Sequence, residues 1–308
     1  ATQSLNIFGD HSDVMACRQT GFAMLVESSV QEVMDLSPVA HLCAIEGKVP
    51  FLNFFDGFRT SHEYQKIEKW DYADLKEMCN MEAVEEFRKK ALNPENPKMR
   101  GSHENGDVFF QHREACNSVY NALPAVVEKY MAKINAKLGT NYDLFNYYGA
   151  PDADRVIVAM GSICDVADEV IDYLNAKGEK VGMVSVHLYR PFSVKHLLAA
   201  VPKTCKKIAV LDRTKEPGAS GEPLYLDVKD AFYNEKERPV IVGGRYGLGS
   251  ADTTPTMIIS VFDNLALPEP KDHFTVGIVD DVTFASLPLE EEKALGGEGI
   301  FEAKFYGL

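Results

Sequence analysis

Residues 155–186 read RVIVAMGSICDVADEVIDYLNAKGEKVGMVSV, and this stretch decides the fold class. The apolar run at 155–160 has the length of a strand, and residues 163–176 carry apolar side chains at helical spacing. A second apolar run, at 181–186, follows the glycine that ends the helix. A strand, a helix and a strand in this order predict two parallel neighbours in one sheet.

The same pattern continues toward the C-terminus. We predict strands at 208–211, 239–242 and 273–278, and helices at 191–200, 222–234 and 255–265. Strands that alternate with helices in this way indicate a doubly wound α/β domain. The chain has no internal repeat with a period of about 20 to 50 residues, which excludes a solenoid.

The N-terminal part of the chain predicts a second, smaller unit of the same kind. We predict a strand at 4–8, a helix at 13–26, a second helix that follows Ser28-Ser29 and ends at Gly47, and a strand at 49–55. The last of these strands is almost wholly apolar, which is typical of a strand covered on both faces. This order again predicts a parallel sheet.

The stretch between the two units, from about residue 64 to 150, is richer in Lys, Glu and Tyr. Residues 117–138 carry an apolar stripe and predict a long amphipathic helix. We interpret residues 146–151, NYYGAP, as an aromatic turn. The fold class that follows is α/β, with two doubly wound parallel-sheet units joined by a long, partly helical connection.

The composition excludes several classes of function. The formal net charge is −14, so most of the surface would repel a phosphate backbone, and we expect no nucleic-acid partner. The longest apolar runs are of strand length, well short of the ~20 residues of a membrane span, so we expect no membrane partner. The 6 cysteines form no CxxC and predict neither a zinc nor an iron–sulfur site within the chain. They are typical of reduced thiols in a cytoplasmic protein.

Two loops follow predicted strands of the first unit, at the edge of a parallel sheet where ligands bind. The candidate side chains in these loops are Asp10, His11, Asp13, Asp56, Arg59, His62 and Glu63. Carboxylates beside histidines, with an arginine, could orient an anionic substrate or a cofactor ring. The alternative is structural, because the same side chains can cap helices and form ion pairs. From the residues alone, no catalytic residue is assigned.

Two further loops follow predicted strands of the second unit. The glycine-rich loop 243–249 lacks the dinucleotide-binding spacing, and we interpret it as a backbone turn against a neighbouring domain. The charged loop 212–218 is open to three interpretations: an interface loop, an ion-pair network or a weak phosphate site. The histidines are scattered, with no HxH or HxxxH pair, so we predict no metal site.

Several stretches of the chain resemble the pyruvate:ferredoxin (flavodoxin) oxidoreductases, and they occur in the same order. They are IFGDHSDVMACRQTGFAML at 7–25, VPFLNFFDGFRTSHE at 49–63, FNYYGAPDADRVIVAMGS at 145–162, LYRPF at 188–192 and AVLDRTKEPGASGEPLYLDV at 209–228. The resemblance covers essentially the whole chain. Motifs of this length are highly specific.

The resemblance implies a chemistry that composition does not show. The family oxidatively decarboxylates pyruvate with coenzyme A to acetyl-CoA and carbon dioxide, and it reduces ferredoxin or flavodoxin. Its cofactors are thiamine diphosphate with Mg²⁺ and [4Fe–4S] clusters, and the enzyme is a homodimer. The resemblance places the activating glutamate, the pyruvate-binding arginine, the diphosphate and magnesium site and the cluster cysteines outside this chain. It therefore implies that the chain binds none of these cofactors completely.

The resemblance also implies a division of the chain. Residues 1–117 resemble the C-terminal part of the thiamine pyrimidine-binding domain, 118–152 a helical connection, and 153–268 a transketolase C-terminal-like domain. Residues 269–308 then form a linker and the first strand of a third domain, at 304–308. On this map, the two candidate loops of the first unit approach the active site or its dimer neighbour.

We accordingly expect an interior piece of a larger cytoplasmic enzyme, inactive alone, whose partners include the rest of the parent polypeptide. Two alternatives stay open. One is a non-catalytic binding or assembly module that kept this fold, and flanking sequence would distinguish it. The other is another 2-oxoacid:ferredoxin oxidoreductase, because the resemblance places most residues that select the substrate outside this stretch.

Overall fold

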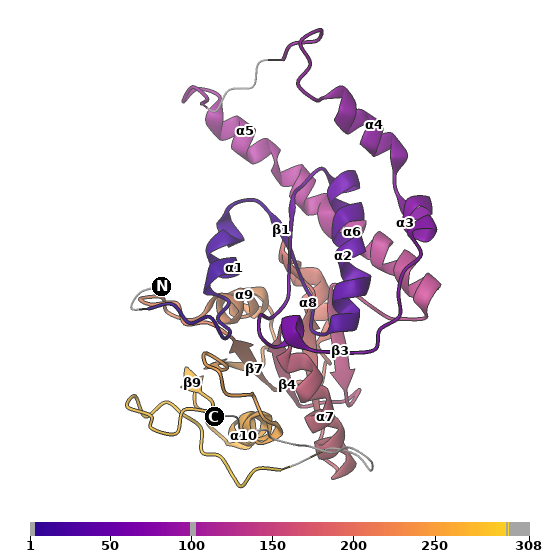
Figure 1. Cartoon of the computed structure of the whole chain (residues 1–308). Coiled ribbons are helices and arrows are strands. Elements are labelled where there is room, and N and C mark those ends of the chain that lie inside the picture. The colour runs from indigo at the N-terminus through magenta and orange to yellow at the C-terminus, as the bar shows by residue number, and fades with distance from the viewer. Residues whose placement is uncertain (1–3, 99–102, 294, 296–308) are drawn as a thin grey trace.

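The computed structural model of the chain describes residues 4–98, 103–293 and 295. Its strands form two sheets flanked by helices, and a pair of helical segments extends away from them (Figure 1). The fold is α/β with parallel strands in both sheets, as the sequence predicts. Within the described residues, no helix is long and apolar enough to cross a membrane.

The larger sheet is built by the second half of the chain, with the strand order β3-β5-β4-β7-β8-β9. Its strands are β3 Phe145–Gly149, β4 Arg155–Ala159, β5 Val181–Val186, β7 Lys207–Asp212, β8 Val240–Arg245 and β9 Phe274–Thr275. All neighbours are parallel except β3, which runs antiparallel to β5 at the edge. The central strands β4 and β5 are buried on both faces, which is why they read as continuous apolar runs.

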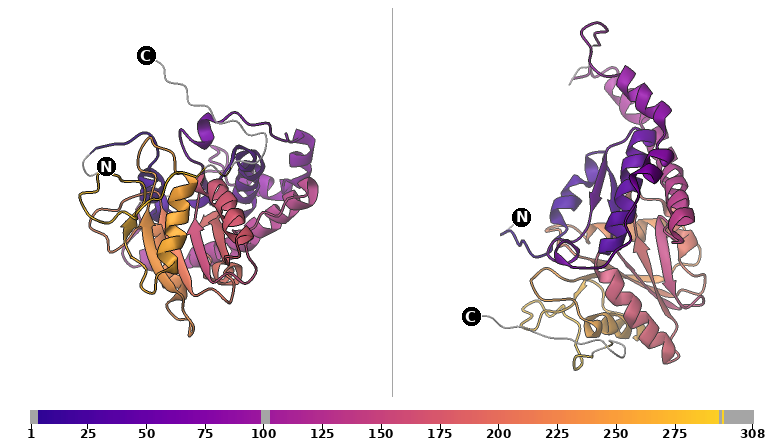
Figure 2. Two further views of the ribbon diagram at one scale, coloured as in Figure 1. Left: turned by 90° about the horizontal axis from the view of Figure 1, so that it is seen from below. Right: turned by 45° about the vertical axis from the view of Figure 1, so that its right-hand side comes forward.

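Helices cover both faces of this sheet (Figure 2). They are α7 Ile163–Ala176, α8 Val194–Ala200, α9 Pro223–Phe232 and α10 Pro255–Ala266. α7 packs against α10 on one face, and α8 packs against α9 on the other. Each face buries its own apolar cluster, with Ile157 and Phe262 in one and Val158 and Leu224 in the other. The doubly wound arrangement predicted for this unit is confirmed.

The smaller sheet has the order β2-β1-β6, from β1 Ala23–Val26, β2 Phe51–Phe54 and β6 Leu188–Arg190. β1 and β2 are parallel, whereas β6 comes from the second half of the chain and pairs antiparallel with β1. The first unit therefore completes its sheet with a strand from the second unit, which no sequence pattern indicated. The pairing of β6 with β1 joins the two units through backbone hydrogen bonds.

Two long helices pack together beside the smaller sheet, α2 Val30–Gly47 and α6 Asn117–Leu138. Both lie where the sequence predicts them. α2 begins after Ser29, whose hydroxyl accepts a hydrogen bond from the N–H of Glu32 at 3.2 Å. α6 ends at Gly139, which has the left-handed conformation of a helix C-terminus.

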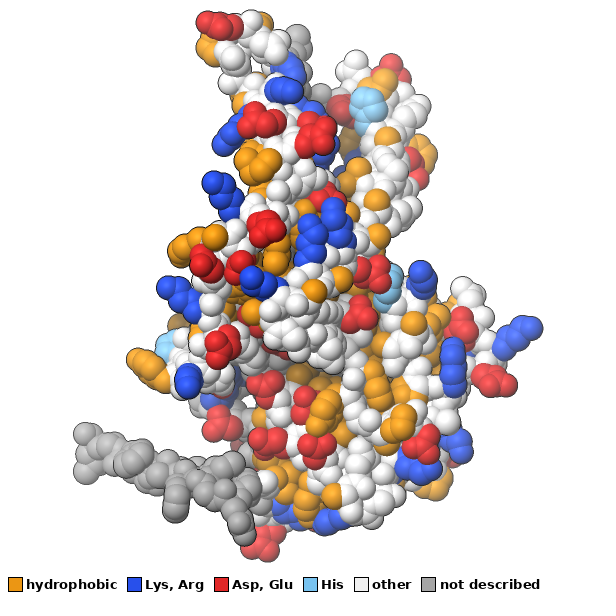
Figure 3. Space-filling view, turned by 90° about the vertical axis from the view of Figure 1, so that its right-hand side faces the viewer, with side chains coloured by type: hydrophobic (Ala, Val, Ile, Leu, Met, Phe, Trp, Pro, Cys, Tyr) orange, Lys and Arg blue, Asp and Glu red, His pale blue; other side chains and the backbone are white. Residues whose placement is uncertain are grey.

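The arm consists of residues 72–98 and 103–115 and extends beyond the two sheets (Figures 1 and 2). It holds α3 Tyr72–Met78, α4 Met81–Lys89 and α5 Phe109–Ala115. Figure 3 shows apolar side chains on its surface between charged ones. Phe87 is 77% exposed and Phe110 is 71% exposed, so the arm buries little apolar area against its own chain.

Some local predictions near the N-terminus are wrong. Residues 4–8 form no strand. The predicted helix 13–26 divides into the short helices α1 Ser12–Ala16 and η1 Cys17–Gln19, followed by β1. Gly21 separates the helices from the strand with φ +92°, a conformation that favours glycine. The apolar residues 23–26 after Gly21 therefore form a strand, although the sequence pattern had placed them in the helix.

Two later predictions also need correction. Residues 146–149 belong to β3 rather than to a turn, because Tyr147 pairs with Val184 across the sheet edge. The strand predicted at 273–278 extends over only two residues, β9, since Gly277 turns the chain with φ +88°. The strand predicted at 304–308 lies outside the described residues.

Candidate functional site

A cavity of about 440 Å³ lies between the C-terminal end of β2 and the loop that leads into α1. It is lined by residues 5–7, 9–14 and 53–57, so both candidate loops of the first unit border it. Its described lining contains carboxylates and apolar side chains but no lysine or arginine. The position agrees with the general rule that parallel sheets bind ligands at the carboxyl ends of their strands.

The two loops meet at a buried contact between His11 and Asp56. His11 Nε2 lies 2.5 Å from Asp56 Oδ1, and both side chains are buried. The backbone N–H of His11 donates to the carbonyl of Arg213 at 2.8 Å, which fixes the loop against the second unit. Gly9 has φ +128°, and a Cβ atom there would collide with the Arg213 guanidinium. Only glycine therefore allows the loop to pass this close.

Asp56 also binds the second unit directly. Its Oδ2 accepts hydrogen bonds from the N–H of Ser162 at 2.8 Å and from the Ser162 hydroxyl at 2.6 Å. The same oxygen lies 3.1 Å from Arg213 Nη1. Ser162 follows β4 and Arg213 follows β7, so this carboxylate joins the ends of strands from both sheets. We call His11, Asp56, Ser162 and Arg213 the Asp56 cluster.

The partners of Asp56 decide its charge. Burial by itself raises the pKa of this carboxyl, but the hydrogen bond from His11 and the charge of Arg213 outweigh that effect. The pKa of Asp56 therefore lies well below its usual range, and the group is ionised. A buried ion pair of this kind is costly to break from one side, because the other charge is left without a partner.

The other charged candidates of the second loop lie apart from this cluster. Arg59 Nη1 lies 2.5 Å from Asp252 Oδ1, and Arg59 Nη2 donates to the carbonyl of Ser250 at 2.8 Å. His62 is exposed and stacks on Phe58, with ring centroids 4.7 Å apart. Arg59 therefore tethers a loop of the second unit.

The remaining candidates fit the structural alternative. Asp10 accepts a hydrogen bond from the N–H of Ser12 at 2.9 Å, at the start of α1. Asp13 is exposed and accepts from the N–H of Val14 at 2.7 Å. Glu63 is exposed as well and accepts a hydrogen bond from the nearby Gln65 side chain. None of these side chains reaches the Asp56 cluster.

Sequence reasoning missed the two members of the cluster that the second unit supplies. The loop 212–218, which contains Arg213, is charged and follows a strand, and Gly161-Ser162 also follows a strand. A Cβ at Gly161 would lie 2.8 Å from Asp56 Oδ2, so this glycine permits the approach. The signals were present, but nothing in one sequence connects residues this far apart.

Glu27 is a second buried carboxyl that sequence reasoning missed. It follows β1, is 0% exposed, and neither of its carboxyl oxygens has a hydrogen-bond partner within the described residues. Asn53 Oδ1 likewise has none there. Burial, followed by the charge of Glu32, raises the pKa of Glu27 to about 9. The neutral acid is the form that such surroundings favour.

Glu32 and His187 form a partly buried contact between the two units, with Nε2 and Oε1 3.3 Å apart. Burial disfavours both charges, yet the charge of His187 lowers the pKa of Glu32 and that of Glu32 raises the pKa of His187. Both shifts indicate an ionised pair. His187 precedes β6, so this pair holds the shared strand in place.

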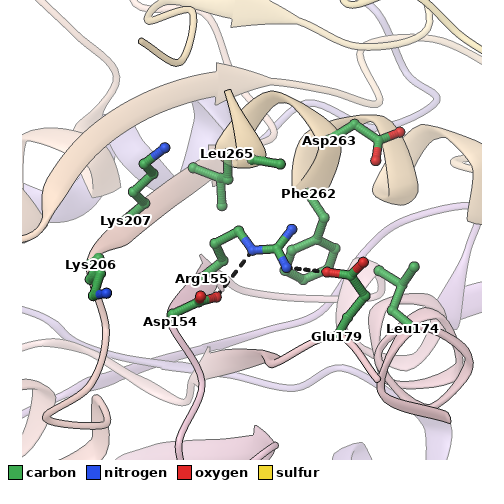
Figure 4. A pocket seen from close by; sticks show the side chains of 10 residues that line it. Asp154, Arg155, Leu174, Glu179, Lys206, Lys207, Phe262, Asp263 and Leu265 are labelled. Carbon is green, nitrogen blue, oxygen red and sulfur yellow. Dashed lines mark hydrogen bonds and ion pairs between the residues drawn. The ribbon is translucent and has the colours of Figure 1, made fainter. Parts of the chain in front are cut away.

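A cavity of about 450 Å³ lies at the opposite, N-terminal edge of the larger sheet (Figure 4). Arg155 at the start of β4 lies between Asp154 and Glu179 and forms ion pairs with both. Lys207 Nζ donates to the carbonyl of Leu267. These charges have partners within the chain, which favours a structural role. Among the described residues, no group of three or more His, Cys, Asp or Glu could hold a metal ion.

Comparison with protein families identifies two matches along the chain. Residues 1–132 match the family model described as "Pyruvate flavodoxin/ferredoxin oxidoreductase, thiamine diP-bdg". Residues 153–258 match the model described as "Pyruvate:ferredoxin oxidoreductase core domain II". The first match includes both loops that border the 440 Å³ cavity.

Curated relatives match over the full chain. The chain is 62% identical over 309 residues to the pyruvate-flavodoxin oxidoreductase of Enterobacter agglomerans. It is 54% identical over 308 residues to the pyruvate:ferredoxin oxidoreductase of Moorella thermoacetica. Each match covers 100% of this chain and 26% of the relative, so the chain spans about a quarter of their length.

A solved structure has a related fold. The 2-oxoglutarate:ferredoxin oxidoreductase from Magnetococcus marinus aligns with a TM-score of 0.51 and 17% sequence identity. The alignment covers 85% of this chain and 46% of that chain. At this identity the likeness shows the fold alone.

Proposed function

Because this chain belongs to the pyruvate:ferredoxin (flavodoxin) oxidoreductase family, we propose that the protein containing it oxidatively decarboxylates pyruvate with coenzyme A. The products are acetyl-CoA and carbon dioxide, and the electrons pass to ferredoxin or flavodoxin. The observation that carries this proposal is 62% identity, along the whole chain, to a pyruvate-flavodoxin oxidoreductase. The 308 residues alone are not expected to turn over pyruvate, because the chain spans only about a quarter of such relatives.

The 440 Å³ cavity fits one part of thiamine diphosphate, the cofactor that stabilises the carbanion formed when a 2-oxoacid loses carbon dioxide. Phe54, Phe55 and Ile7 give it apolar and aromatic walls that suit a pyrimidine ring. The lining does not suit the diphosphate, because Asp10 and Asp13 line it and its described residues include no lysine or arginine. We place the diphosphate with Mg²⁺, and the [4Fe–4S] clusters, on residues outside this chain.

His11 and Asp56 act here as positioning residues. The ionised Asp56 accepts a hydrogen bond from His11 Nε2 and holds the imidazole ring in the lining of the cavity. Arg213 and Ser162 fix the carboxylate in turn, so the second unit keeps the wall rigid. A rigid wall lowers the entropy cost of orienting a bound ring.

We further propose the division of the chain into 1–117, 118–152, 153–268 and 269–308, with the same domain identities as above. α6 and β3 lie in the proposed connection and pack on the first and second units, respectively. The parent protein is proposed to be a cytoplasmic homodimer. The six cysteines of this chain are free thiols, which is typical of a reducing compartment.

The activity is tested with the full-length protein, using pyruvate, coenzyme A and oxidised ferredoxin or flavodoxin. We expect reduction of the carrier that depends on both pyruvate and coenzyme A. A preference for 2-oxoglutarate would instead favour the rival 2-oxoacid oxidoreductase. A full-length protein that oxidises no 2-oxoacid, although it is loaded with thiamine diphosphate and its clusters, would favour the non-catalytic module.

The role of the cavity is tested by the thiamine diphosphate concentration that half-activates the full-length enzyme. Asp56→Asn removes the charge that holds His11 and Arg213, and we expect this concentration to rise about tenfold. The matched control is Asp13→Asn, because Asp13 lines the same cavity but is exposed. It should change the value less than about twofold. Equal effects of the two variants would show that the Asp56 cluster does not position the residues that bind the cofactor.

A further inference from the structure

A separate cavity of about 350 Å³ lies at the C-terminal ends of β8 and β9. Residues 245–249, 251–253 and 275–278 line it, together with Lys215, Met257 and Thr283. This is the edge of the larger sheet at which doubly wound folds bind ligands. Its volume falls within the range of small-molecule sites, about 300–1,000 Å³.

Two cationic side chains, Lys215 and Arg245, line the cavity. Lys215 Nζ and Arg245 Nη1 both contact the carboxylate of Glu222, at 3.2 and 3.3 Å. Glu222 is 1% exposed, so two cations share a single buried anion. Asp252 also lines the cavity, but its carboxylate pairs with Arg59. Because the Lys215 side chain is 50% exposed, its ammonium group also remains accessible to an anionic ligand.

The glycine-rich loop supplies backbone donors to the lining of the same cavity. Gly247 has φ +68°, and its carbonyl accepts a hydrogen bond from Arg213 Nε at 3.1 Å, which fixes the loop to the Asp56 cluster. The N–H groups of Leu248 and Gly249 have no acceptor within the part of the chain that the structure describes. A Cβ at Gly249 would meet no atom within 4 Å. Successive free N–H groups in a turn are a common way to bind an anion.

The rest of the cavity is apolar. Leu248, Met257, Val276 and Ile278 line it, and Ile278 is 46% exposed. A bare inorganic ion would leave these side chains in water. A ligand with an apolar body would cover them and gain the free energy of burying their surface.

We propose that this cavity binds a small organic anion, with a phosphate or carboxylate head and an apolar body. The head contacts Lys215, Arg245 and the N–H groups of the glycine-rich loop, and the body contacts Met257 and Ile278. Arg59 clamps the wall at 250–252 through Ser250 and Asp252, so the loop that borders the first cavity also shapes this one. The proposal does not rest on the oxidation of pyruvate.

The test is isothermal titration calorimetry on the full-length protein with three probes: phenyl phosphate, inorganic phosphate and phenol. We expect phenyl phosphate to bind in a saturable manner and at least about tenfold more tightly than either other probe. Lys215→Gln should weaken phenyl phosphate about tenfold, since Lys215 is half exposed and its loss leaves the Glu222–Arg245 pair intact. The matched control Lys203→Gln removes an exposed lysine outside the cavity and should change nothing.

A second variant tests the apolar lining of the cavity separately from its cationic side chains. Ile278→Ser should weaken phenyl phosphate about fivefold and leave the weak binding of inorganic phosphate unchanged. Phenyl phosphate binding that is equal in the wild type and in Lys215→Gln, or binding without saturation, would overturn the proposal. Equal losses in Lys215→Gln and Lys203→Gln would also overturn it, because they would indicate a general effect of charge.

Discussion

The ends of β1 and β2 carry two buried carboxyl groups in opposite states. Asp56, after β2, has hydrogen bonds and charges from His11, Ser162 and Arg213, and its pKa is depressed. Glu27, after β1, has no such partner among the described residues, and burial raises its pKa to about 9. Adjacent parallel strands thus hold one ionised and one neutral acid. Burial alone does not decide the charge of a carboxyl group; the partners that replace water decide it.

The largest loss of stability is expected when the cation that pairs with Asp56 is removed. Arg213→Met leaves a buried carboxylate with only His11 and Ser162, and we expect the free energy of unfolding to fall by about 3–5 kcal/mol. Urea unfolding of the chain measures this. The matched control is Arg88→Met, which breaks an exposed pair with Glu85 and should cost less than about 1 kcal/mol. Similar losses in both variants would show that the Asp56 cluster contributes no more than a surface pair.

Glu27 provides the opposite test. Its folded pKa of about 9 lies above the ordinary 4.5, so the stability of the neutral form is present below pH 4.5 and is lost as the pH rises through 9. Glu27→Gln stays neutral at every pH. We expect it to stabilise the chain by about 4 kcal/mol at pH 8 and by less than about 0.5 kcal/mol at pH 4.5. Thermal unfolding across this pH range measures the difference.

Glu46 is the matched control for Glu27, because its shift has the opposite sign. Hydrogen bonds from Lys129 and Tyr130 lower the pKa of Glu46 to about 2, so its stabilising charge is present above the ordinary pKa of 4.5 and is lost as the pH falls through 2. Glu46→Gln should therefore destabilise the chain at pH 8. If Glu27→Gln destabilised it at pH 8 as well, Glu27 would be an ionised group.

A smaller change weakens the Asp56 cluster without removing a charge. Ser162→Ala deletes the hydroxyl that donates to Asp56 Oδ2 but keeps the backbone N–H that donates to the same oxygen. We expect a loss of about 1 kcal/mol in the free energy of unfolding. Ser118→Ala, at an exposed hydroxyl that bonds to the Ala115 carbonyl, is the control and should change it by less than about 0.5 kcal/mol.

The smallest effect is expected at the exposed candidates. Asp13→Asn and Glu63→Gln should each change the free energy of unfolding by less than about 0.5 kcal/mol, because water replaces every contact that they lose. The measurement is again urea unfolding. A loss above about 1 kcal/mol for either variant would show that the carboxylate it replaces stabilises the fold.

Much of the fold was predictable because its signals are local. The helix at 163–176 and the strand at 181–186 lie where periodicity and glycine placement put them. The helix at 117–138 was predicted for the same reason. The failures occurred where the local signal is short, as in the four-residue β1, which the helical interpretation of 13–26 covered. β6 was missed because a three-residue strand becomes a strand only through its partner β1.

The candidate site was predictable in part. His11 and Asp56 were named as candidates, and the structure brings them within 2.5 Å. Arg59, His62 and Glu63 came from the same loop by the same reasoning, yet they lie apart from the cluster. A loop presents its side chains in several directions, and sequence spacing in an irregular segment does not say which ones converge.

The fold class, the long helices and the family resemblance could be read from the sequence, because each depends on patterns or motifs within a continuous stretch. Which charges share a site depends instead on how the chain folds in space. Ser162 and Arg213 reach Asp56 from 106 and 157 positions away along the chain, and the strand ends bring them together. The ionisation of Asp56 and the neutrality of Glu27 follow from those distant neighbours, since a pKa responds to what surrounds a group in space.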